Sequence, residues 1–232
     1  MNRFIFIIVF IFSINISSDE VNDPFENLNR KTFEFNENLD QKILKPTAKF
    51  YSKFPPRIKK GITNFFNNLE EVDTSVNQLL QGKPKKSAND FTRFVINSTV
   101  GLGGFIDVAS KIGLERHEED FGQTLAVWGV GEGPYIMLPG LGPSTLRDTF
   151  SRPVSSFLSV TFHMTETDVN IALKSIDAIE TRERLLEVES LLSGDKYSFV
   201  KDAYIQSIQY EVKDGINVQD DFVDDMDDFL ID

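Results

Sequence analysis

The chain has 232 residues, no cysteine, and a formal net charge of −12, from 24 lysines and arginines against 36 aspartates and glutamates. The lack of cysteine excludes disulfide bridges, thiolate zinc sites and a cysteine nucleophile, and the acidic balance argues against general nucleic-acid binding. The 21 phenylalanines suit either a large core or a surface that faces hydrocarbon, because their rings carry no polar group.

Residues 1–18 predict an export signal. Arg3 is followed by an unbroken apolar run at 4–12 and then by small and polar residues. This run is too short for a transmembrane helix, which needs about 20 apolar residues. We expect cleavage near Ser17 or Ser18, with an uncleaved membrane anchor as the alternative.

Helix signals dominate the next segment. Asp23 and Pro24 form a helix start, and apolar residues then recur at the helical period as far as Ile43. Pro46 is expected to end or kink this helix. A second helix should begin at the Pro55-Pro56 pair and be closed by Gly82 and Pro84, and a third is expected over 87–99.

Two more helices are expected toward the C-terminus. Asp168 is expected to cap a helix that Gly194 stops, and Asp195 to start a last one that ends before Gly215. The main domain is therefore predicted at 19–213. Residues 214–232 hold eight aspartates and no lysine or arginine, which indicates a separate acidic tail, either disordered or a weak partner-docking helix.

The region 120–150 differs from the helical segments. Six glycines and three prolines interrupt it, so a long helix is excluded. We expect Tyr135 to Leu138 to form one arm of a hairpin and Pro143 to restart a helix. Loops of this length are often functional.

Catalytic motifs are missing from the sequence. It contains no nucleophile elbow, zinc-protease or P-loop motif. It has only two histidines: the charged residues around His117 predict a solvated loop, and the apolar residues beside His163 predict a packed position. We therefore expect no enzyme activity, cofactor or metal. The stretch GLGGF at 101–105 lacks the spacing of a dinucleotide loop, and its glycines indicate a tight bend instead.

Five ordered blocks together resemble the MlaA (VacJ) family of phospholipid-transport lipoproteins. The resemblance covers roughly residues 22–210. The blocks are NDPFENLNRKTFEFN (22–36), TNFFNNLEE (63–71), DFTRFVINSTVGLGGFIDVAS (90–110), FGQTLAVWGVGEGPYIMLPGLGPSTLRD (121–148) and IETRERLL (179–186).

The resemblance implies a mainly α fold, in which amphipathic helices form a ring that lies in the membrane plane, with a Gly/Pro-rich hairpin region and a central amphipathic channel. It implies removal of mislocalised phospholipid from the outer leaflet of the outer membrane, without covalent chemistry. The implied partners are an outer-membrane porin and a periplasmic lipid carrier of the Mla pathway, and the implied location is the periplasmic side of the outer membrane.

Two other functions stay open. The chain is alternatively a structural protein that stabilises a porin or envelope complex without moving lipid. A lipid hydrolase with an unfamiliar site is the third reading. One departure from the family also matters: its members carry an acylated cysteine after the signal, whereas this sequence has INISSDE and no cysteine. We then expect helix burial or a partner to hold the protein at the membrane, or else a soluble form.

The resemblance also implies a set of channel residues. Asn64 and Phe65 are expected to control lipid passage, and the three glycines to bend the chain between apolar helices. The full set of expected lipid-channel residues is Asn64, Phe65, Gly101, Gly103, Gly104, Asp107, Trp128, Tyr135, Met137, Leu138, Arg147 and Asp148.

Overall fold

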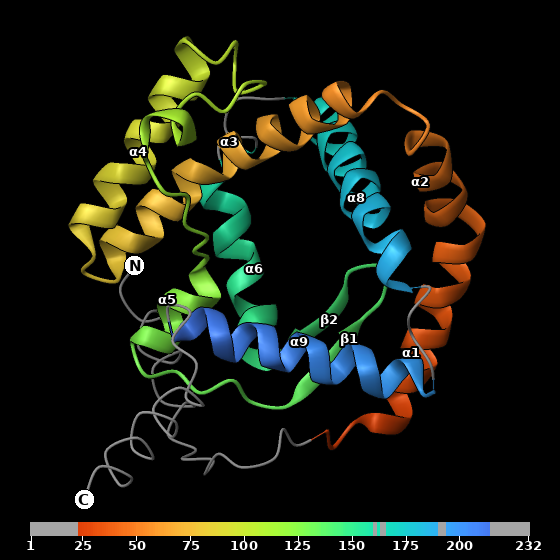
Figure 1. Ribbon diagram of the computed structural model, residues 1–232. Coiled ribbons are helices and arrows are strands. Elements are labelled where there is room, and N and C mark those ends of the chain that lie inside the picture. The colour runs from red at the N-terminus through yellow and green to blue at the C-terminus, as the bar shows by residue number, and fades with distance from the viewer. Residues whose placement is uncertain (1–22, 160–161, 163–165, 190–193, 214–232) are drawn as a thin grey trace, which may run out of the picture.

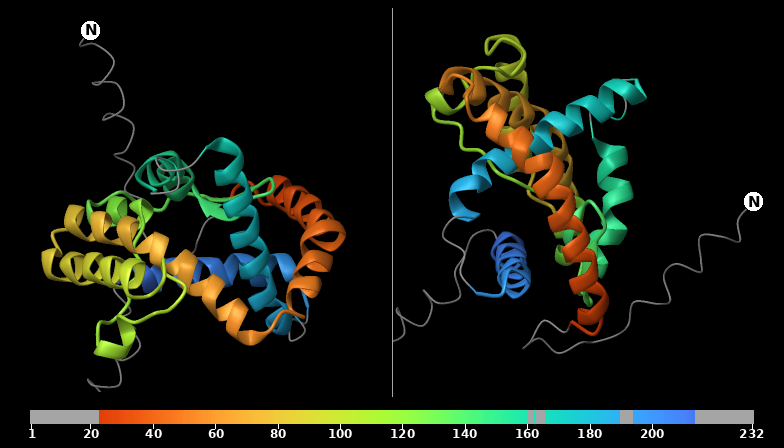
Figure 2. Two further views of the ribbon diagram at one scale, coloured as in Figure 1. Left: turned by 90° about the horizontal axis from the view of Figure 1, so that it is seen from above. Right: turned by 90° about the vertical axis from the view of Figure 1, so that its right-hand side faces the viewer.

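The helices close into a ring around a central opening, as Figure 1 shows. The computed structural model describes residues 23–159, 162, 166–189 and 194–213. Seen from its edges in Figure 2, the ring is less deep than it is wide. The signal predicted at 1–18 and the acidic tail predicted at 214–232 lie outside the described residues.

The first segment forms one curved side of the ring. α1 (Glu26–Leu39) runs into a π-helical turn, η2 (Asp40–Leu44), and then into α2 (Lys45–Tyr51). Pro46 does not end the helical run; instead, a π-helical turn directly precedes the segment that contains it, and this turn accommodates the missing N–H of the proline. Asp23 does not cap α1; its carboxylate accepts a hydrogen bond from Asn29 Nδ2 at 2.8 Å instead.

The next two helices form an antiparallel pair. α3 (Pro56–Leu80) begins at the second proline of the predicted pair and ends before Gly82, whose φ of +76° is left-handed; Pro84, expected to close this helix, is the first residue of the next one. α4 (Pro84–Thr99) packs along it. A short 3₁₀ turn, η3 (Ser110–Ile112), follows the glycine-rich bend.

Residues 120–150 fold into short elements, as their glycines predict. α5 (Phe121–Val127) is capped by Asp120, which accepts from the Gln123 N–H at 2.7 Å. The hairpin consists of β1 (Tyr135–Leu138) and β2 (Gly142–Thr145). The predicted first arm is confirmed, but the predicted helix start at Pro143 is wrong.

Pro143 pairs with Met137 in the antiparallel sheet, and α6 (Leu146–Leu158) starts only after Thr145, whose hydroxyl accepts from the Asp148 N–H at 3.1 Å. The Thr145 hydroxyl can cap a helix, and for this reason α6 starts after Thr145 and not at Pro143.

Two further helices complete the ring. α8 (Thr167–Glu189) packs against α2, and α9 (Lys196–Val212) packs against α5 and β2. Asp195 caps α9 as predicted, accepting from the Tyr197 N–H at 3.2 Å. A small apolar core joins the hairpin to α1 and α9; it contains Phe33, Tyr135, Met137, Tyr197, Val200, Tyr204 and Ile205.

Burial along α3 and α4 is inverted relative to an ordinary water-soluble helix pair. Their interface is polar, with Glu71, Gln78, Asp90 and Arg93 at 0–1% exposed. Large apolar side chains of these helices are exposed instead, as are those of the bend that follows α4. Leu79, Leu80, Phe91 and Val95 on the helices, and Val100, Leu102 and Phe105 in the bend, are each at least 41% exposed. Large exposed apolar patches mark surfaces that contact lipid or another protein.

None of the helices in the described part of the chain is both long and apolar enough to cross a membrane.

Candidate functional site

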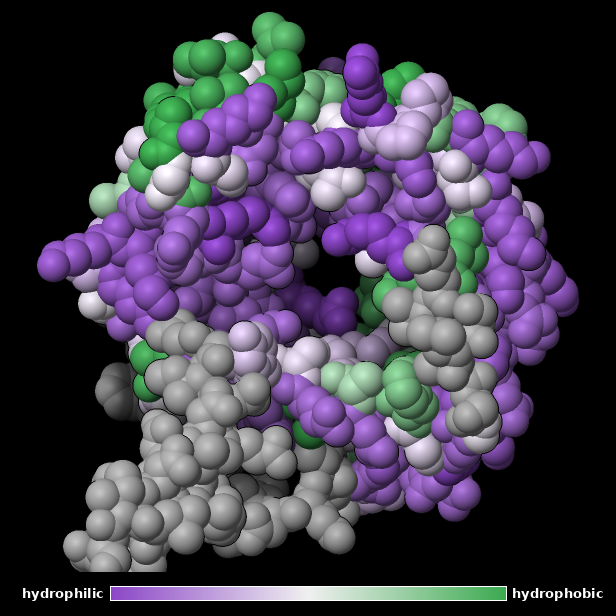
Figure 3. Space-filling view, in the orientation of Figure 1, coloured by the Kyte–Doolittle hydropathy of each residue, from purple (hydrophilic) through white to green (hydrophobic). Residues whose placement is uncertain are grey.

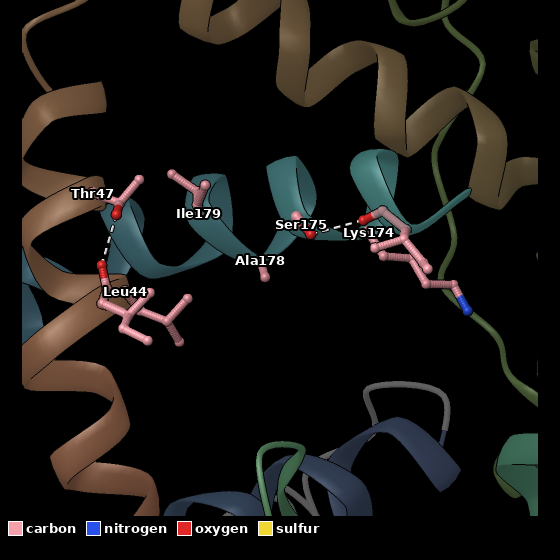
Figure 4. A pocket seen from close by; sticks show the side chains of 8 residues that line it. Leu44, Thr47, Lys174, Ser175, Ala178 and Ile179 are labelled. Carbon is pink, nitrogen blue, oxygen red and sulfur yellow. Dashed lines mark hydrogen bonds between the residues drawn. The ribbon is translucent and has the colours of Figure 1, made fainter. Parts of the chain in front are cut away.

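An open cavity of about 470 Å³ faces the middle of the ring. Its lining comes from η2, α2 and α8; Figure 4 shows Leu44 projecting from the first segment, and Ala178 and Ile179 on different sides of α8. Lys174 is the single charged residue among those that line the cavity, and Figure 4 shows its ammonium group directed away from Leu44 and Thr47. The lining residues are Ile43, Leu44, Thr47, Ile171, Lys174, Ser175, Ala178 and Ile179.

The opening itself is visible in the space-filling view, where hydrophilic side chains border much of it and green apolar atoms lie at one side (Figure 3). The wall of the opening is therefore amphipathic. Acyl chains favour the apolar part, while a charged headgroup needs polar partners when it leaves water.

The sequence of α8 explains why it forms a wall rather than a core helix. Its apolar residues do not fall on one stripe, and Val169, Ile171 and Ile176 are 45%, 62% and 43% exposed. Such a helix presents apolar side chains on more than one face. It thus separates the apolar part of the opening from the outer surface.

Ion pairs fix α8 to the first segment. Arg182 donates to both carboxylate oxygens of Asp40, at 2.6 and 2.8 Å, and to Glu189 at 2.6 Å. Lys45 donates to Glu189 at 2.8 Å. The hydrogen bonds from Lys45 and Arg182 lower the pKa of Glu189 to about 2. These pairs hold the cavity walls at a fixed separation.

A second polar cluster lies between α3 and α4. Arg93 donates to Glu71 at 2.7 Å, to the Leu114 carbonyl at 2.6 Å and to Asp107 at 3.3 Å. Burial raises the pKa of Glu71 to about 7, against the opposing effect of Arg93. A void of about 10 Å³ beside them has room for about one water molecule.

Asp107 belongs to this cluster and not to the wall of the central cavity. It accepts from Asn97 Nδ2 at 3.1 Å and from the Ser110 N–H at 3.0 Å. Burial would raise the pKa of Asp107, but the Ser110 hydrogen bonds and the Arg93 charge outweigh it and lower that pKa. Its observed role is to tie the bend to α4.

His117 also joins this interface. Its Nδ1 lies 2.9 Å from a carboxylate oxygen of the fully buried Asp90. His117 lies in a loop, as expected, and its side chain is 25% exposed. The contact with the buried Asp90 of α4 was not predicted from the sequence.

The glycine stretch is a bend, as predicted. Leu102, Gly103 and Gly104 have φ values of +57°, +70° and +94°. Gly104 also packs closely on α3, since an added Cβ there would lie 2.8 Å from the Asn68 side chain. Gly101 is tighter still, because a Cβ would lie 2.2 Å from the Ile106 carbonyl oxygen.

Asn64 and Phe65 contact this bend. Asn64 Nδ2 donates to the Phe105 carbonyl at 3.1 Å, and the Phe65 ring lies 5.4 Å from the Phe105 ring. The structure thus brings together two of the sequence-predicted groups, the TNFF block and the glycines. Neither residue is among those that line the central cavity.

Arg147 and Asp148 connect three elements of the ring. Arg147 Nε donates to Asp148 at 2.9 Å, and the Arg147 N–H donates to the Glu132 carbonyl at 3.1 Å. Tyr204 of α9 donates to Asp148 at 3.0 Å. The proximity of Asp148 and burial raise the pKa of Tyr204, with burial the larger cause. Arg147 is only 3% exposed.

The predicted apolar channel residues lie in three different places. Tyr135 and Met137 are 0% and 4% exposed, so they pack the small core instead of lining the opening. Leu138 is half-buried, and its carbonyl accepts from Asn36 at 2.9 Å. Trp128 is 54% exposed and donates to the Leu80 carbonyl at 3.1 Å.

The sequence interpretation missed the residues of α8 that line the cavity. One signal was available: Lys174 is the only lysine or arginine of residues 167–181 and sits among isoleucines and alanines. The described residues contain no cluster of histidine, aspartate or glutamate arranged to hold a metal ion.

Comparison with known proteins gives consistent results. Residues 21–211 match the family model described as MlaA lipoprotein. The intermembrane phospholipid transport system lipoprotein MlaA of Escherichia coli K12 is 40% identical over 200 residues, which cover 83% of this chain and 79% of that protein. The protein of the same description from Haemophilus influenzae is 36% identical over 203 residues, covering 84% and 81%.

A solved structure is also similar. It comes from work on the structural basis for maintenance of bacterial outer membrane lipid asymmetry, and it aligns with a TM-score of 0.74 and 38% sequence identity. The alignment covers 82% of this chain and 99% of that one.

Proposed function

This chain belongs to the MlaA lipoprotein family, and from that premise we propose that it carries phospholipids through the central opening of its ring. It acts in intermembrane phospholipid transport and in maintaining the lipid asymmetry of the outer membrane. The observation that carries the proposed route is the amphipathic wall of the opening, whose cavity is lined by isoleucine, leucine and alanine side chains together with one charged residue, Lys174.

The physical argument concerns the headgroup. A lone charge that enters hydrocarbon costs several kcal/mol. A ring with polar side chains on its inner border and an apolar cavity at one side lowers this cost, because headgroup and acyl chains each meet a suitable surface. No covalent step is needed, and the proposed function is transport and not catalysis.

The location follows from the same proposal. The protein is an envelope protein associated with the outer membrane, and we place the ring on its periplasmic side. The inverted burial of α3 and α4 supports this, since each exposed phenylalanine or leucine is worth about 1.5 to 3 kcal/mol when it leaves water. The boundaries 1–18, 19–213 and 214–232 for signal, ring and tail are part of the proposal.

The proposed route runs from the outer leaflet to a periplasmic carrier of the Mla pathway, with an outer-membrane porin as a second partner. Asn64 and Phe65 act on it indirectly in this scheme. They hold the bend at 101–106 against α3, so they set where the bend lies relative to the ring. Arg147 and Asp148 likewise act indirectly, by holding α6 against α9 through the hydrogen bond from Tyr204 to Asp148.

A blocking substitution tests the route. Ala178→Trp places an indole ring in the cavity and narrows it, whereas Ala172→Trp adds the same ring at an exposed position of α8 that does not line the cavity. The readout is outer-leaflet phospholipid, labelled from outside in cells that lack the gene and carry each variant. We expect Ala178→Trp to raise it to the level of the deletion and Ala172→Trp to keep it low.

Equal complementation by both variants would contradict the route through this cavity. A deletion that leaves the outer leaflet unchanged, while a porin complex is lost, would favour the structural alternative. Fatty acid released by the purified protein would favour the hydrolase.

A further inference from the structure

The charges of the chain are unevenly distributed around the ring. Between Asp40 and Glu70 every charged residue is basic, although the chain as a whole has a net charge of −12. The seven bases are Lys42, Lys45, Lys49, Lys53, Arg57, Lys59 and Lys60. They run along η2 and α2 and into the first turns of α3, at the outer corner of the ring where these helices meet (Figure 1).

Two of these bases serve the fold. Lys45 pairs with Glu189 at 2.8 Å, and Lys59 pairs with Glu183 at 2.6 Å. The other five are exposed, and none of them forms an ion pair within the described part of the chain. Five uncompensated positive charges along one short stretch create a local positive potential that the net charge conceals.

Aromatic and aliphatic side chains accompany these charges. Phe50, Phe54 and Ile58 are 63%, 38% and 50% exposed, and the rings of Phe50 and Phe54 pack edge to face with centroids 5.8 Å apart. Lys49 and Lys53 each precede one of the phenylalanines by one position. A row of bases therefore runs beside a row of apolar side chains, which is the pattern of helices that lie at a membrane interface.

We propose that this basic edge, formed by Lys42, Lys49, Lys53, Arg57 and Lys60 with Phe50, Phe54 and Ile58, binds the headgroup layer of a membrane that contains anionic phospholipid. The charges complement phosphate and phosphatidylglycerol-type headgroups, and the phenylalanines enter the boundary between headgroups and acyl chains. An acidic protein surface would satisfy the bases but would leave three large apolar side chains in contact with polar groups.

The proposal concerns attachment and orientation of the ring, and it holds independently of the proposed transport route. The α2–α3 corner would be held at the headgroup layer. The cavity beside α2 and α8 would then open close to the lipids that it is proposed to receive.

Vesicle flotation of the purified full chain tests the basic edge. The probes are phosphatidylcholine vesicles with 0% or about 30% phosphatidylglycerol, at low and high salt. Apolar insertion contributes equally to both vesicle types, so the measured quantity is the gain in binding that the anionic lipid gives. We expect this gain to be lost in the triple variant Lys49→Gln, Lys53→Gln, Lys60→Gln, with binding roughly tenfold to hundredfold weaker.

The matched control removes the same amount of charge elsewhere. Lys31→Gln, Lys85→Gln and Lys111→Gln alter three exposed lysines that are scattered over α1, α4 and η3. We expect this control to keep the gain on anionic vesicles. A double variant, Phe50→Ser and Phe54→Ser, should weaken binding to both vesicle types.

Three results would overturn the proposal: no gain on anionic vesicles, an equal loss in the matched control, or zero-length cross-links that place the acidic tail at 214–232 on the basic edge. The transport assay in cells tests the proposed route separately from membrane binding, because Ala178→Trp changes the cavity and leaves the basic edge intact.

Discussion

Arg93 of α4 and Glu71 of α3 form an ion pair at 2.7 Å, with side chains that are 2% and 1% exposed. This pair sits in the polar interface that replaces an apolar core between the two helices. Removal of one partner leaves the other charge buried and uncompensated, which typically costs about 3 to 5 kcal/mol.

We therefore expect Arg93→Met to lower the free energy of unfolding by about that amount, measured by denaturant titration of the purified protein. The double variant Arg93→Met, Glu71→Gln should recover part of the loss, because the fully buried Glu71 carboxylate is then no longer left without its partner. A single variant as stable as the parent would show that the pair is dispensable.

The pH dependence of stability provides a second prediction. Burial raises the pKa of Asp73 from 3.8 to about 6, and one of its carboxylate oxygens has no hydrogen-bond partner among the described residues. The folded state therefore binds the Asp73 proton more tightly than the unfolded state does. The stabilisation that comes from protonated Asp73 is complete below a pH of about 4 and is lost as the pH rises through about 6.

Asp73→Asn removes this titration. We expect the variant to be more stable than the parent at pH 7.5, and to show a flatter change in melting temperature between pH 4 and 7. The parent gains at most about 1.4 kcal/mol per pH unit from this group as the pH falls. Parallel pH profiles for the two proteins would contradict the prediction.

The bend gives a third prediction through two neighbouring glycines. A Cβ at Gly101 would lie 2.2 Å from the Ile106 carbonyl oxygen and 2.4 Å from that of Asn97, whereas a Cβ at Gly103 meets nothing within 4 Å. Gly101→Ala should cost at least about 3 kcal/mol, the upper end of overpacking.

Gly103→Ala should cost only about 1 to 2 kcal/mol, the penalty of a left-handed conformation. The denaturant midpoints of the two variants, measured under the same conditions, show whether Gly101→Ala is the more destabilising substitution. Equal losses would mean that conformational freedom, and not close packing, explains both glycines.

Lys174 carries the fourth prediction. As the single charged residue among those lining the cavity, it is suited to attract a phosphate group on the proposed route. Lys174→Glu should raise outer-leaflet phospholipid by repelling that group, while Lys174→Arg should preserve function. Normal lipid distribution in the glutamate variant would remove Lys174 from the route.

The helices were largely predictable because their signals are local. Pro56, Gly82 and Asp195 act on the backbone within one turn, and each begins or ends a helix where expected. The prediction of a helix start at Pro143 failed because a proline fits an edge strand as well as a helix start. Pro143 is in a strand because it pairs with Met137, and the residues next to Pro143 in the sequence do not reveal this pairing.

The candidate site was less predictable for a related reason. Helical periodicity indicates that a stripe of apolar residues faces something other than water, but it does not indicate whether that is a core, a lipid or an opening. Tyr135 and Met137 turned out to pack the core, and Ile171 and Ile179 the cavity. In neither pair do the neighbouring residues in the sequence indicate which of these surroundings the side chains meet.

The sequence by itself determined most of the helices, the bend at the glycines and, through five ordered blocks, the family. These depend on steric and hydrogen-bonding preferences that act over a few residues. Only the tertiary structure decided that α3 and α4 bury their polar faces, that α8 walls the opening, and that Lys174 stands in the cavity. Those facts depend on which distant segments meet, and contacts such as that between Arg182 and Asp40, 142 residues apart, form only when the ring closes.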